Sequence, residues 1–385
     1  MRVLIVTNLY PSRWQPHRAE FNRQQFAALA AWHQVRLIAP VAWTKQWRQP
    51  AEHEGQLLLR DGLTVEHPCY VYPPKVLRSW HGRFFLSSIK SSFERAVEEF
   101  RPEVVLASWA YPDAWAAMKL TQAAGLPLVV KVHGSDLLLM ANDGERRRQT
   151  IEAITGADAV IAVSRQLAGR AAELGVDPAR LNVVYNGVDT ELFQPGSADV
   201  AREKLKLSSE PLVLFVGNLA PVKSLDTLIS ACSLLRDRNL RFQCRLIGHG
   251  ALRRDLTRQI QSARLTKFVQ LHGPCHLHQL PDWYRAANVL VLPSVSEGVP
   301  NVILEAQACG TPVVASRVGG IPEILDDSCL VPAKDPIALA DAIERTLNCP
   351  NVVRRPLTSW TQSAAHLAGI LSEVAQSTLV QRAAA

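Results

Sequence analysis

The sequence predicts an α/β protein made of two doubly wound, Rossmann-like domains. Short apolar runs rich in Val, Ile and Leu alternate with longer helical patterns along the whole chain, which is the order of parallel strands with crossover helices. The chain is 385 residues long. Because ordinary domains hold about 100–200 residues, two domains are expected rather than one.

The apolar runs are continuous rather than alternating, which is typical of strands covered on both faces. In the first half we expect strands at Arg2–Thr7, Val35–Ala39, Val104–Ser108, Leu126–Val132, Ala159–Val163 and Val183–Tyr185. In the second half we expect them at Leu212–Val216, Cys244–Ile247, Phe268–Leu271, Val289–Leu292 and Pro312–Ala315. Helical patterns between them, for example Ala19–Ala31 and Ser224–Leu235, supply the crossovers.

A turn-rich connector near the middle of the chain predicts the domain boundary. Asn, Gly, Asp and Pro cluster between Tyr185 and Ser197, and a new strand begins at Leu212. The predicted domains are therefore residues 1–190 and 191–385. A last helix at about Ser363–Gln381 is open to packing on either domain, including back on the first.

Composition narrows the class of protein. Hydrophobic residues make up 48% of the chain and charged residues 20%, as in soluble globular proteins. No apolar run approaches the ~20 residues of a membrane span, and the N-terminal segment lacks a small-residue cleavage site. The cytoplasm is therefore the default compartment. Seven dispersed cysteines without a C-x-x-C pair indicate neither a disulfide framework nor a zinc site.

The net charge of +7 favours an anionic partner, either a phosphate ligand, an acidic lipid surface or nucleic acid. A solvated basic surface with no specific partner is an equally open interpretation. Nucleic acid is not expected, because the basic residues follow no recognisable nucleic-acid-binding motif.

The most informative stretch runs from Ser294 to Gly310, SVSEGVPNVILEAQACG. It leaves a predicted strand, passes through a tight loop, and opens a short helix that ends at Gly310. Pro300 fits the first turn of that helix, and Gly298 allows a ligand to approach the backbone. The amides of Gly298, Val299 and Asn301, at the positive end of the helix, then form a phosphate site.

Two carboxylates flank this anion site, with Glu297 before the helix and Glu305 within it. Carboxylates are poorly suited to binding phosphate, but they suit hydroxyl groups. The stretch therefore predicts a ligand that carries both phosphates and hydroxyls, such as a sugar joined to a nucleotide diphosphate. The alternative is a strand, turn and helix with surface glutamates.

Glu297 and Glu305 have the Glu-x7-Glu spacing of retaining glycosyltransferases, and the surrounding residues resemble family 4 of the GT-B fold. Asn186–Asp189 and Val318–Glu323 also resemble segments of that family. The resemblance implies two Rossmann-like domains facing a central cleft. It further implies that Glu297 holds the transferred sugar and Glu305 the nucleotide ribose.

A second element, from Phe215 to Asp226, passes from a strand through a glycine turn into a helix. It resembles the family's Gly-Arg…Lys-Gly segment, whose cations neutralise the leaving pyrophosphate. Gly217 and Lys223 match that pattern, whereas Asn218 replaces the arginine and Ser224 the glycine. A charged hydrogen bond contributes roughly 1.5–3 kcal/mol, so the replacement of arginine by Asn218 weakens the expected clamp.

Two loops that follow predicted strands are candidates for a base pocket, namely Ile247–Gly250 and Leu271–Pro274. Ordinary turns would explain them as well. In the first half, His133 follows the strand beginning at Leu126 and resembles the family's cleft histidine, which lies beside the donor sugar. The loop from Asn8 to Arg23 lacks the glycine pair of many relatives and looks more like the branch that makes bacterial surface polysaccharides.

A stretch of interleaved basic and aromatic residues leaves two interpretations open. It contains Lys75, Arg78, Arg83, Lys90, Arg95 and Arg101 together with Trp80, Phe84, Phe85 and Phe93. Such a pattern suits peripheral contact with an anionic membrane on its inner face, near a lipid-linked acceptor. Glu94, Glu98 and Glu99 dilute the charge and favour an ordinary packed helix.

The sequence as a whole predicts a retaining glycosyltransferase that moves a sugar from a nucleotide-diphosphate donor to a glycan or lipid-linked acceptor. We assign Glu297 and His133 to the catalytic centre. Gly217, Asn218, Lys223, Gly298, Val299, Pro300, Asn301 and Glu305 are assigned to the donor. No cofactor is expected, and no Asp-x-Asp pair suggests a metal. The alternatives are an epimerase of sugar nucleotides and a non-catalytic protein that binds them.

Overall fold

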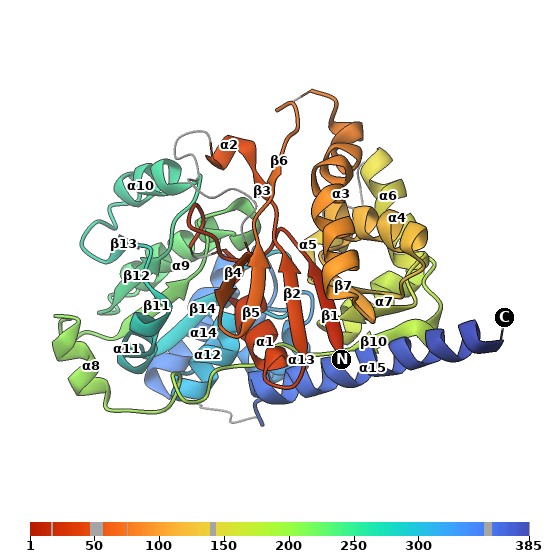
Figure 1. The fold of residues 1–385 in the computed structure, drawn as a ribbon. Coiled ribbons are helices and arrows are strands. Elements are labelled where there is room, and N and C mark those ends of the chain that lie inside the picture. The colour runs from red at the N-terminus through yellow and green to blue at the C-terminus, as the bar shows by residue number, and fades with distance from the viewer. Residues whose placement is uncertain (17, 47–56, 75, 139–143, 350–355, 385) are drawn as a thin grey trace. The chain divides into compact units, whose positions relative to one another are not determined.

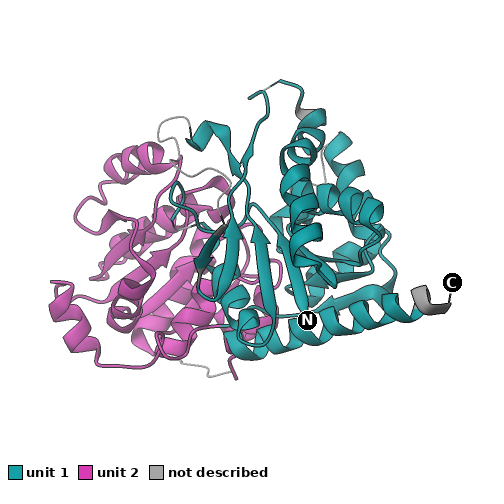
Figure 2. Cartoon of the chain, viewed as in Figure 1, with its two compact units in different colours: residues 1–187, 360–385 teal, residues 188–359 magenta. Residues whose placement is uncertain are grey.

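The computed structural model describes residues 1–16, 18–46, 57–74, 76–138, 144–349 and 356–384. The chain forms two compact units, one of residues 1–187 with 360–385 and one of residues 188–359 (Figure 2). The first unit thus ends after Gly187 rather than Thr190. The last helix, which the sequence left open to packing on either domain, belongs to the first unit.

The described part of the first unit contains an eight-stranded sheet in the order β10-β9-β8-β7-β1-β2-β5-β4 (Figure 1). Every neighbouring pair is parallel except β4 and β5. A short parallel pair, β3–β6, lies outside the sheet. The strands are β1 (Arg2–Val6), β2 (Gln34–Ile38), β3 (Val41–Ala42), β4 (Leu57–Arg60), β5 (Leu63–Glu66), β6 (Cys69–Tyr70), β7 (Val104–Ser108), β8 (Leu128–Val132), β9 (Ala159–Ala162) and β10 (Leu181–Val183).

Two differences from the predicted strands have simple causes. The hairpin β4–β5 was not predicted, although its turn, Asp61-Gly62 with φ of 52° and 78°, is a two-residue hairpin signal. The strand predicted at 183–185 lies two residues earlier, as β10. The strand ends earlier than predicted because Tyr185 and Gly187 belong to the connector that follows it.

Each face of the first sheet has its own apolar core, because alternate strand residues point to opposite faces. Leu4 and Val6 pack in one core, and Val3 and Ile5 in the other. The first core includes side chains of α3 (His81–Phe100), α4 (Trp115–Ala124), α6 (Gly144–Thr155) and α7 (Arg165–Glu173), and the second those of α1 (Glu20–Ala30) and α15 (Trp360–Ala384). The short helices are α2 (Trp43–Gln46), α5 (Ser135–Leu138), η1 (Arg78–Trp80), η2 (Ala110–Ala114) and η4 (Pro178–Arg180).

A buried chain of hydrogen bonds holds the last helix on the first unit. Lys131, fully buried on β8, donates to Gln25 Oε1 at 2.5 Å. The Gln25 amide donates to Ser363 Oγ at 2.9 Å, and Ser363 donates to the carbonyl of Tyr185 at 2.7 Å. These polar groups would be costly to bury alone, so they select one position for α15.

The described part of the second unit contains a six-stranded parallel sheet in the order β13-β12-β11-β14-β15-β16. Its strands are β11 (Leu212–Val216), β12 (Gln243–Ile247), β13 (Val269–Gly273), β14 (Val289–Leu292), β15 (Val313–Ser316) and β16 (Leu330–Val331). Its helices are α8 (Ala198–Lys204), α9 (Leu225–Asp237), α10 (Arg253–Ser262), α11 (Leu280–Ala286), α12 (Asn301–Cys309), α13 (Ile321–Ile324) and α14 (Pro336–Asn348), with 3₁₀ turns η5 (Pro221–Lys223), η6 (Leu277–Gln279) and η7 (Asp327–Cys329). The predicted class, doubly wound α/β in two units, is confirmed.

None of the described helices is long and apolar enough to cross a bilayer.

The close approach of two loops in the second unit predicts a strong effect of one methyl group. Gly248 has φ of +140°, and a Cβ there would lie 1.8 Å from the Gly217 carbonyl oxygen. We expect Gly248→Ala to lower the free energy of unfolding by about 3 kcal/mol, measured by urea denaturation. Gly369→Ala is the matched control: nothing lies within 4 Å of its Cβ in the middle of α15, so it should stabilise by about 0.5–1 kcal/mol. Equal effects of the two substitutions would contradict this account.

Candidate active site

The strand order of each sheet reverses once, which marks the place where open α/β sheets bind ligands. In the first sheet the chain moves outward from β1 in one direction and from β7 in the other, and in the second sheet from β11 and from β14. Ligands bind outside the carboxyl ends of the strands at such a switch point. The expected ligand-binding loops are therefore those that follow β1 and β7 in the first unit and β11 and β14 in the second.

A lysine and a glutamate join the two loops at the switch point of the second unit. Lys223, at the end of η5, lies 2.5 Å from Glu297 Oε1, and Ser294 Oγ donates to the same oxygen at 2.6 Å. The Lys223 and Glu297 side chains are 18% and 12% exposed, so the pair is largely buried but still reachable by solvent or a ligand. Glu297 is thereby fixed in one orientation with its charge balanced.

Backbone contacts fix the same loop from two sides. Val295 donates to the Val222 carbonyl at 2.9 Å, and Gly320 donates to the Gly298 carbonyl at 2.9 Å. Gly319 has φ of +56°, and a Cβ there would lie 1.9 Å from the Glu297 carbonyl oxygen. Because residue 319 is a glycine, the Val318–Glu323 segment can pack against the loop that carries Glu297.

The N-terminus of α12 points its amides at this switch point. Pro300 is the N-cap and α12 begins at Asn301, so Pro300 lies one residue before the first turn that the sequence suggested for it. The backbone N–H groups of Gly298, Val299 and Val302 donate to no residue that the structure describes. Unsatisfied amides at a helix N-terminus bind anions. The Val302 amide was not predicted.

Glu305 lies inside the second unit and differs in character from Glu297. It is 9% exposed, and its Oε2 accepts a hydrogen bond of 2.6 Å from the hydroxyl of Tyr284 on α11. Burial raises the pKa of Glu305 to about 7, an effect that the Tyr284 hydrogen bond partly opposes. Burial also raises the pKa of Tyr284 well above its ordinary value, so the tyrosine remains a donor.

These environments explain how two glutamates can flank an anion site. Glu297 carries a negative charge that Lys223 balances at 2.5 Å. Burial disfavours the ionised form of Glu305 and raises its pKa to about 7, so this group carries less negative charge than a free carboxylate. The net repulsion of an incoming phosphate is therefore much smaller than two free carboxylates would produce.

The remaining donor-side residues also gather at the carboxyl edge of the second sheet. Gly217 directly follows β11 and donates to the Ile247 carbonyl at 2.9 Å, while Gly248 donates to the Gly273 carbonyl at 2.7 Å. The two candidate base loops thus run beside the Gly217 turn. The Asn218 side chain is exposed and bonds to no described residue.

His133 occupies the carboxyl edge of the first sheet, directly after β8. Its Nε2 lies 2.8 Å from Ser108 Oγ at the end of β7. Ser108 also lies 3.2 Å from Asn22 Oδ1, and the amide of Asn22 donates to the Leu9 carbonyl at 2.8 Å. The single hydrogen of Ser108 goes to Asn22, so His133 is left to donate from Nε2. Neither Ser108 nor Asn22 was predicted, because each is an ordinary polar residue in the sequence.

Aromatic rings enclose the His133 imidazole. Phe21 lies 5.1 Å from it between ring centroids, and Trp109 lies 6.2 Å away with the rings inclined by 29°. Trp109 has φ of 141° and ψ of 125°, a backbone conformation that residues other than glycine rarely adopt. Such strain persists only where the surroundings enforce it and is found often at functional sites. Trp109 was not predicted.

Buried aspartic acid side chains fix the loops around His133. Asp136 accepts from the backbone N–H groups of His133 and Gly134, the latter at 2.8 Å, and from that of Ala110 at 3.2 Å. Asp113 accepts from the backbone and the side-chain amide of Asn8. Burial raises the pKa of both acids, that of Asp113 to about 8.

The sequence-predicted residues therefore fall into two groups. Those brought together at the switch point of the second unit are Gly217, Asn218, Lys223, Glu297, Gly298, Val299, Pro300 and Asn301, with Glu305 buried further along α12. His133 lies in the first unit. Among the described residues, no three or more His, Cys, Asp or Glu side chains are grouped as they would be to hold a metal ion.

Comparison with known families adds independent evidence. The family model described as glycosyl transferases group 1 matches residues 210–349, and that described as Glycosyltransferase Family 4 matches residues 23–192. A D-inositol 3-phosphate glycosyltransferase of Frankia alni is 37% identical over 214 residues, which are 52% of this chain and 53% of that protein. This chain thus spans about half the length of that relative.

Two further comparisons extend over nearly the whole chain. A putative teichuronic acid biosynthesis glycosyltransferase of Bacillus subtilis, TuaC, is 29% identical over 364 residues, covering 90% of this chain and 89% of that protein. The structure of sucrose-phosphate synthase from Thermosynechococcus elongatus has a TM-score of 0.78 at 24% identity and covers 99% of this chain and 98% of that one. At 24% identity, the likeness to sucrose-phosphate synthase is evidence of a shared fold only.

The two-unit architecture and these matches define a protein of the GT-B class. Residues 23–192 and 210–349 each match a glycosyltransferase family model, and the likeness to the solved structure supports the GT-B fold.

The buried Glu305 predicts a specific dependence of stability on pH. Its pKa is about 7 in the folded protein against an ordinary 4.5. The protonated side chain therefore contributes stability that is fully present below pH 4.5 and is lost as the pH rises through 7. Glutamine does not titrate. Between pH 4.5 and about pH 8 the wild type should therefore lose on the order of 3 kcal/mol of unfolding free energy relative to Glu305→Gln.

Glu203→Gln on the exposed surface of α8 is the matched control for this measurement. Urea denaturation across the pH range should give parallel curves for the control and wild type. Parallel curves for Glu305→Gln as well would show that burial does not raise the pKa of Glu305.

The surroundings of His133 predict its protonation state. Burial, assisted by the Lys131 charge, holds the pKa of His133 well below its ordinary 6.5. The His133 ring can be assigned in ¹⁵N NMR spectra, because its signal is lost in His133→Gln. We expect this ring to be neutral at about pH 5.5 and to carry its proton on Nε2. Ser108→Ala should remove the preference for that tautomer. A charged ring at this pH, or a proton on Nδ1, would contradict the hydrogen-bond assignment.

Proposed function

We propose that this protein is a retaining glycosyltransferase that moves a sugar from a nucleotide-diphosphate sugar to a glycan or lipid-linked acceptor in the synthesis of a surface polysaccharide. The matches of residues 23–192 and 210–349 to two glycosyltransferase family models support the reaction class. The similarity to TuaC over 90% of the chain, together with its name, supports the polysaccharide assignment.

The observation that carries the proposal is the pairing of Lys223 with Glu297 beside the unpartnered amides at the start of α12. One hydrogen of the Lys223 ammonium is directed to Glu297, and two others remain for phosphate oxygens. The amides of Gly298 and Val299 add neutral donors at the positive end of α12. Together they stabilise the diphosphate where negative charge develops in the transition state.

In the proposed reaction the bond between the anomeric carbon and the oxygen of the second phosphate breaks. A bond from that carbon to an acceptor hydroxyl oxygen forms on the same face of the sugar, and the hydroxyl proton leaves with the diphosphate. Glu297 orients the sugar, and Glu305 accepts a hydrogen bond from a ribose hydroxyl through Oε1. His133 contributes a neutral imidazole to the catalytic centre. Lys223 and the amides meet the phosphate charge, so the proposed reaction needs no metal or other cofactor.

Substitution of Glu297 tests the assignment directly. Donors are found first by thermal shift with nucleotide sugars, because a ligand at about 100 times its dissociation constant stabilises the fold by ~2.7 kcal/mol. Glu297→Gln should keep the shape of the side chain and bind the donor within a few-fold of wild type. Its rate of nucleoside diphosphate release with acceptor should fall by roughly 10²–10³. Glu203→Gln is the control and should leave both quantities unchanged.

The outcomes of this experiment also distinguish the alternatives. Near-normal turnover of Glu297→Gln would refute the role of Glu297. A changed donor sugar formed without any acceptor would indicate an epimerase. Donor binding without turnover against any glycan or lipid extract would indicate a binding protein. Retention is read from the anomeric proton coupling of the product by NMR.

A further inference from the structure

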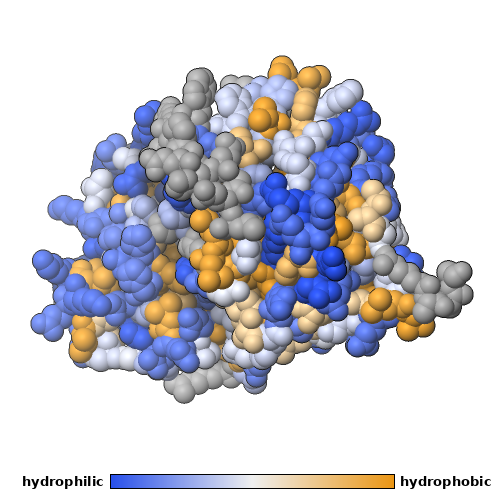
Figure 3. All heavy atoms as spheres, in the orientation of Figure 1, coloured by the Kyte–Doolittle hydropathy of each residue, from blue (hydrophilic) through white to orange (hydrophobic). Residues whose placement is uncertain are grey.

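Three large apolar side chains are exposed at the segment that joins β6 to α3 in the first unit. Val76 is 60% exposed, Leu77 57% and Trp80 48%. We call these three residues the apolar tip. In Figure 3 hydrophobic atoms gather at the top of the view, over the segment between β6 and α3 in Figure 1. Leu77 has φ of +50°, an unfavourable conformation for a residue with a large side chain.

The apolar tip is distinct from the helix that follows it. On α3 the side chains of Phe85, Ile89 and Phe93 are buried in the core of the first unit. Most of the interleaved stretch in the sequence is therefore an ordinary packed helix, as one of the two interpretations held. Of its aromatic side chains only Trp80 is exposed, Phe84 is half-buried, and Lys75 lies outside the described residues.

One arginine of α3 contacts the apolar tip, and α6, which carries further arginines, packs beside η1. Arg83 on α3 places its guanidinium 4.5 Å from the centre of the Trp80 ring. The first turn of α6 packs beside η1, and the Arg83 charge acts on Glu145 of that turn. Arg83 and Arg147 are exposed and form no ion pair with any residue that the structure describes. The arginines of α6 were not part of the sequence-based pattern.

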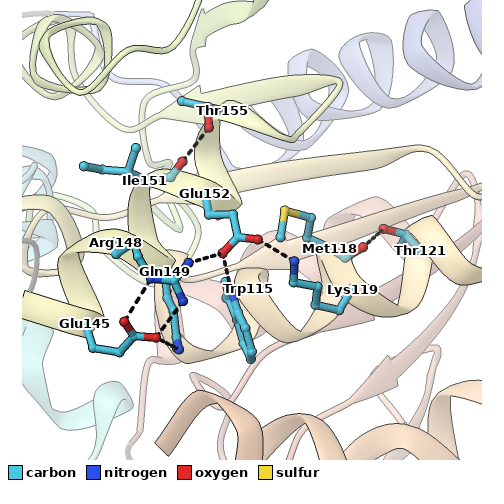
Figure 4. Close-up of polar contacts among 10 residues, drawn as sticks. All are labelled: Trp115, Met118, Lys119, Thr121, Glu145, Arg148, Gln149, Ile151, Glu152 and Thr155. Carbon is cyan, nitrogen blue, oxygen red and sulfur yellow. Dashed lines mark hydrogen bonds and ion pairs between the residues drawn. The ribbon is translucent and has the colours of Figure 1, made fainter. Parts of the chain in front are cut away.

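The acidic residues of α6 are occupied by other partners. Figure 4 shows Glu152 accepting from Trp115 Nε1 at 2.9 Å and pairing with Lys119, which fastens α6 to α4. Glu145 pairs with Arg148 at 2.6 Å. Among the residues that the structure describes, neither Arg83 nor Arg147 has an acidic partner within ion-pair distance, so both charges remain available beside the tip.

We propose that the apolar tip, with Arg83 and Arg147, docks on an anionic phospholipid surface. The tip inserts among the lipid headgroups and upper acyl chains, where Trp is favoured because its ring is amphipathic. The arginines bind lipid phosphates at the same depth. An interface with another protein would need acidic groups opposite the arginines as well as an apolar pocket, whereas an anionic bilayer supplies both chemistries at once. This contact is independent of the proposed sugar transfer.

Vesicle binding tests the proposal without any substrate. The full chain is sedimented with vesicles of phosphatidylcholine alone and with vesicles of equimolar phosphatidylcholine and phosphatidylglycerol. We expect at least about tenfold stronger partition onto the anionic vesicles, decreasing as salt is added. Arg83→Gln with Arg147→Gln should weaken that partition by about thirtyfold. Leu77→Ser with Trp80→Ser should weaken it by at least about tenfold.

Two matched controls separate the surface from general effects of hydrophobicity and charge. Leu59→Ser removes a side chain that is 82% exposed on β4, and Arg254→Gln removes an exposed charge on α10. Both should bind vesicles like wild type, and circular dichroism should show all variants folded. The proposal is overturned if wild type does not bind anionic vesicles, binds both vesicles equally, or keeps its affinity in both double variants. A dimer in vesicle-free solution that Leu77→Ser with Trp80→Ser dissolves would instead assign the tip to self-association.

Discussion

The contact between Lys223 and Glu297 is the interaction on which the candidate site depends. It joins the loop after β11 to the loop after β14 at 2.5 Å, where the strand order of the second sheet reverses. A carboxylate alone at the start of α12 would repel a phosphate from the free amides. Paired with an ammonium, the same carboxylate becomes a fixed acceptor for hydroxyl groups beside a site that still favours anions.

In the first unit, other residues hold the loops at the switch point in place. Its switch-point loops are tied by Asp113, which bonds to Asn8, and by Asp136, which bonds to backbone amides of Ala110, His133 and Gly134. Buried acids of this kind are costly unless hydrogen-bonded, and here the donors are backbone N–H groups together with the Asn8 side-chain amide. The loops around His133 are therefore held in place before any ligand arrives, which is the condition for electrostatic preorganisation.

Much of the fold could be predicted because the strands repeat one local pattern, a short continuous run of apolar residues. Continuous apolar runs of strand length fell on β1, β7, β8, β11 and β14, and the glycine after α12 ends that helix in a left-handed conformation as expected. The hairpin β4–β5 was missed although Asp61-Gly62 signals it. Short β16 could not be seen, because two residues carry no period and only the neighbouring β15 makes them a strand.

The sequence by itself determined the doubly wound class, the family resemblance and the residues at the start of α12, since these depend on the order of apolar runs and on local spacing. Tertiary structure alone decided the partners of those residues. Lys223 and Glu297 are 74 residues apart, Tyr284 meets Glu305 from another helix, and α15 returns across the chain to Gln25. Charge pairing and burial are properties of contacts in space, so the protonation of Glu305 and His133 follows from the packed structure and not from their identities.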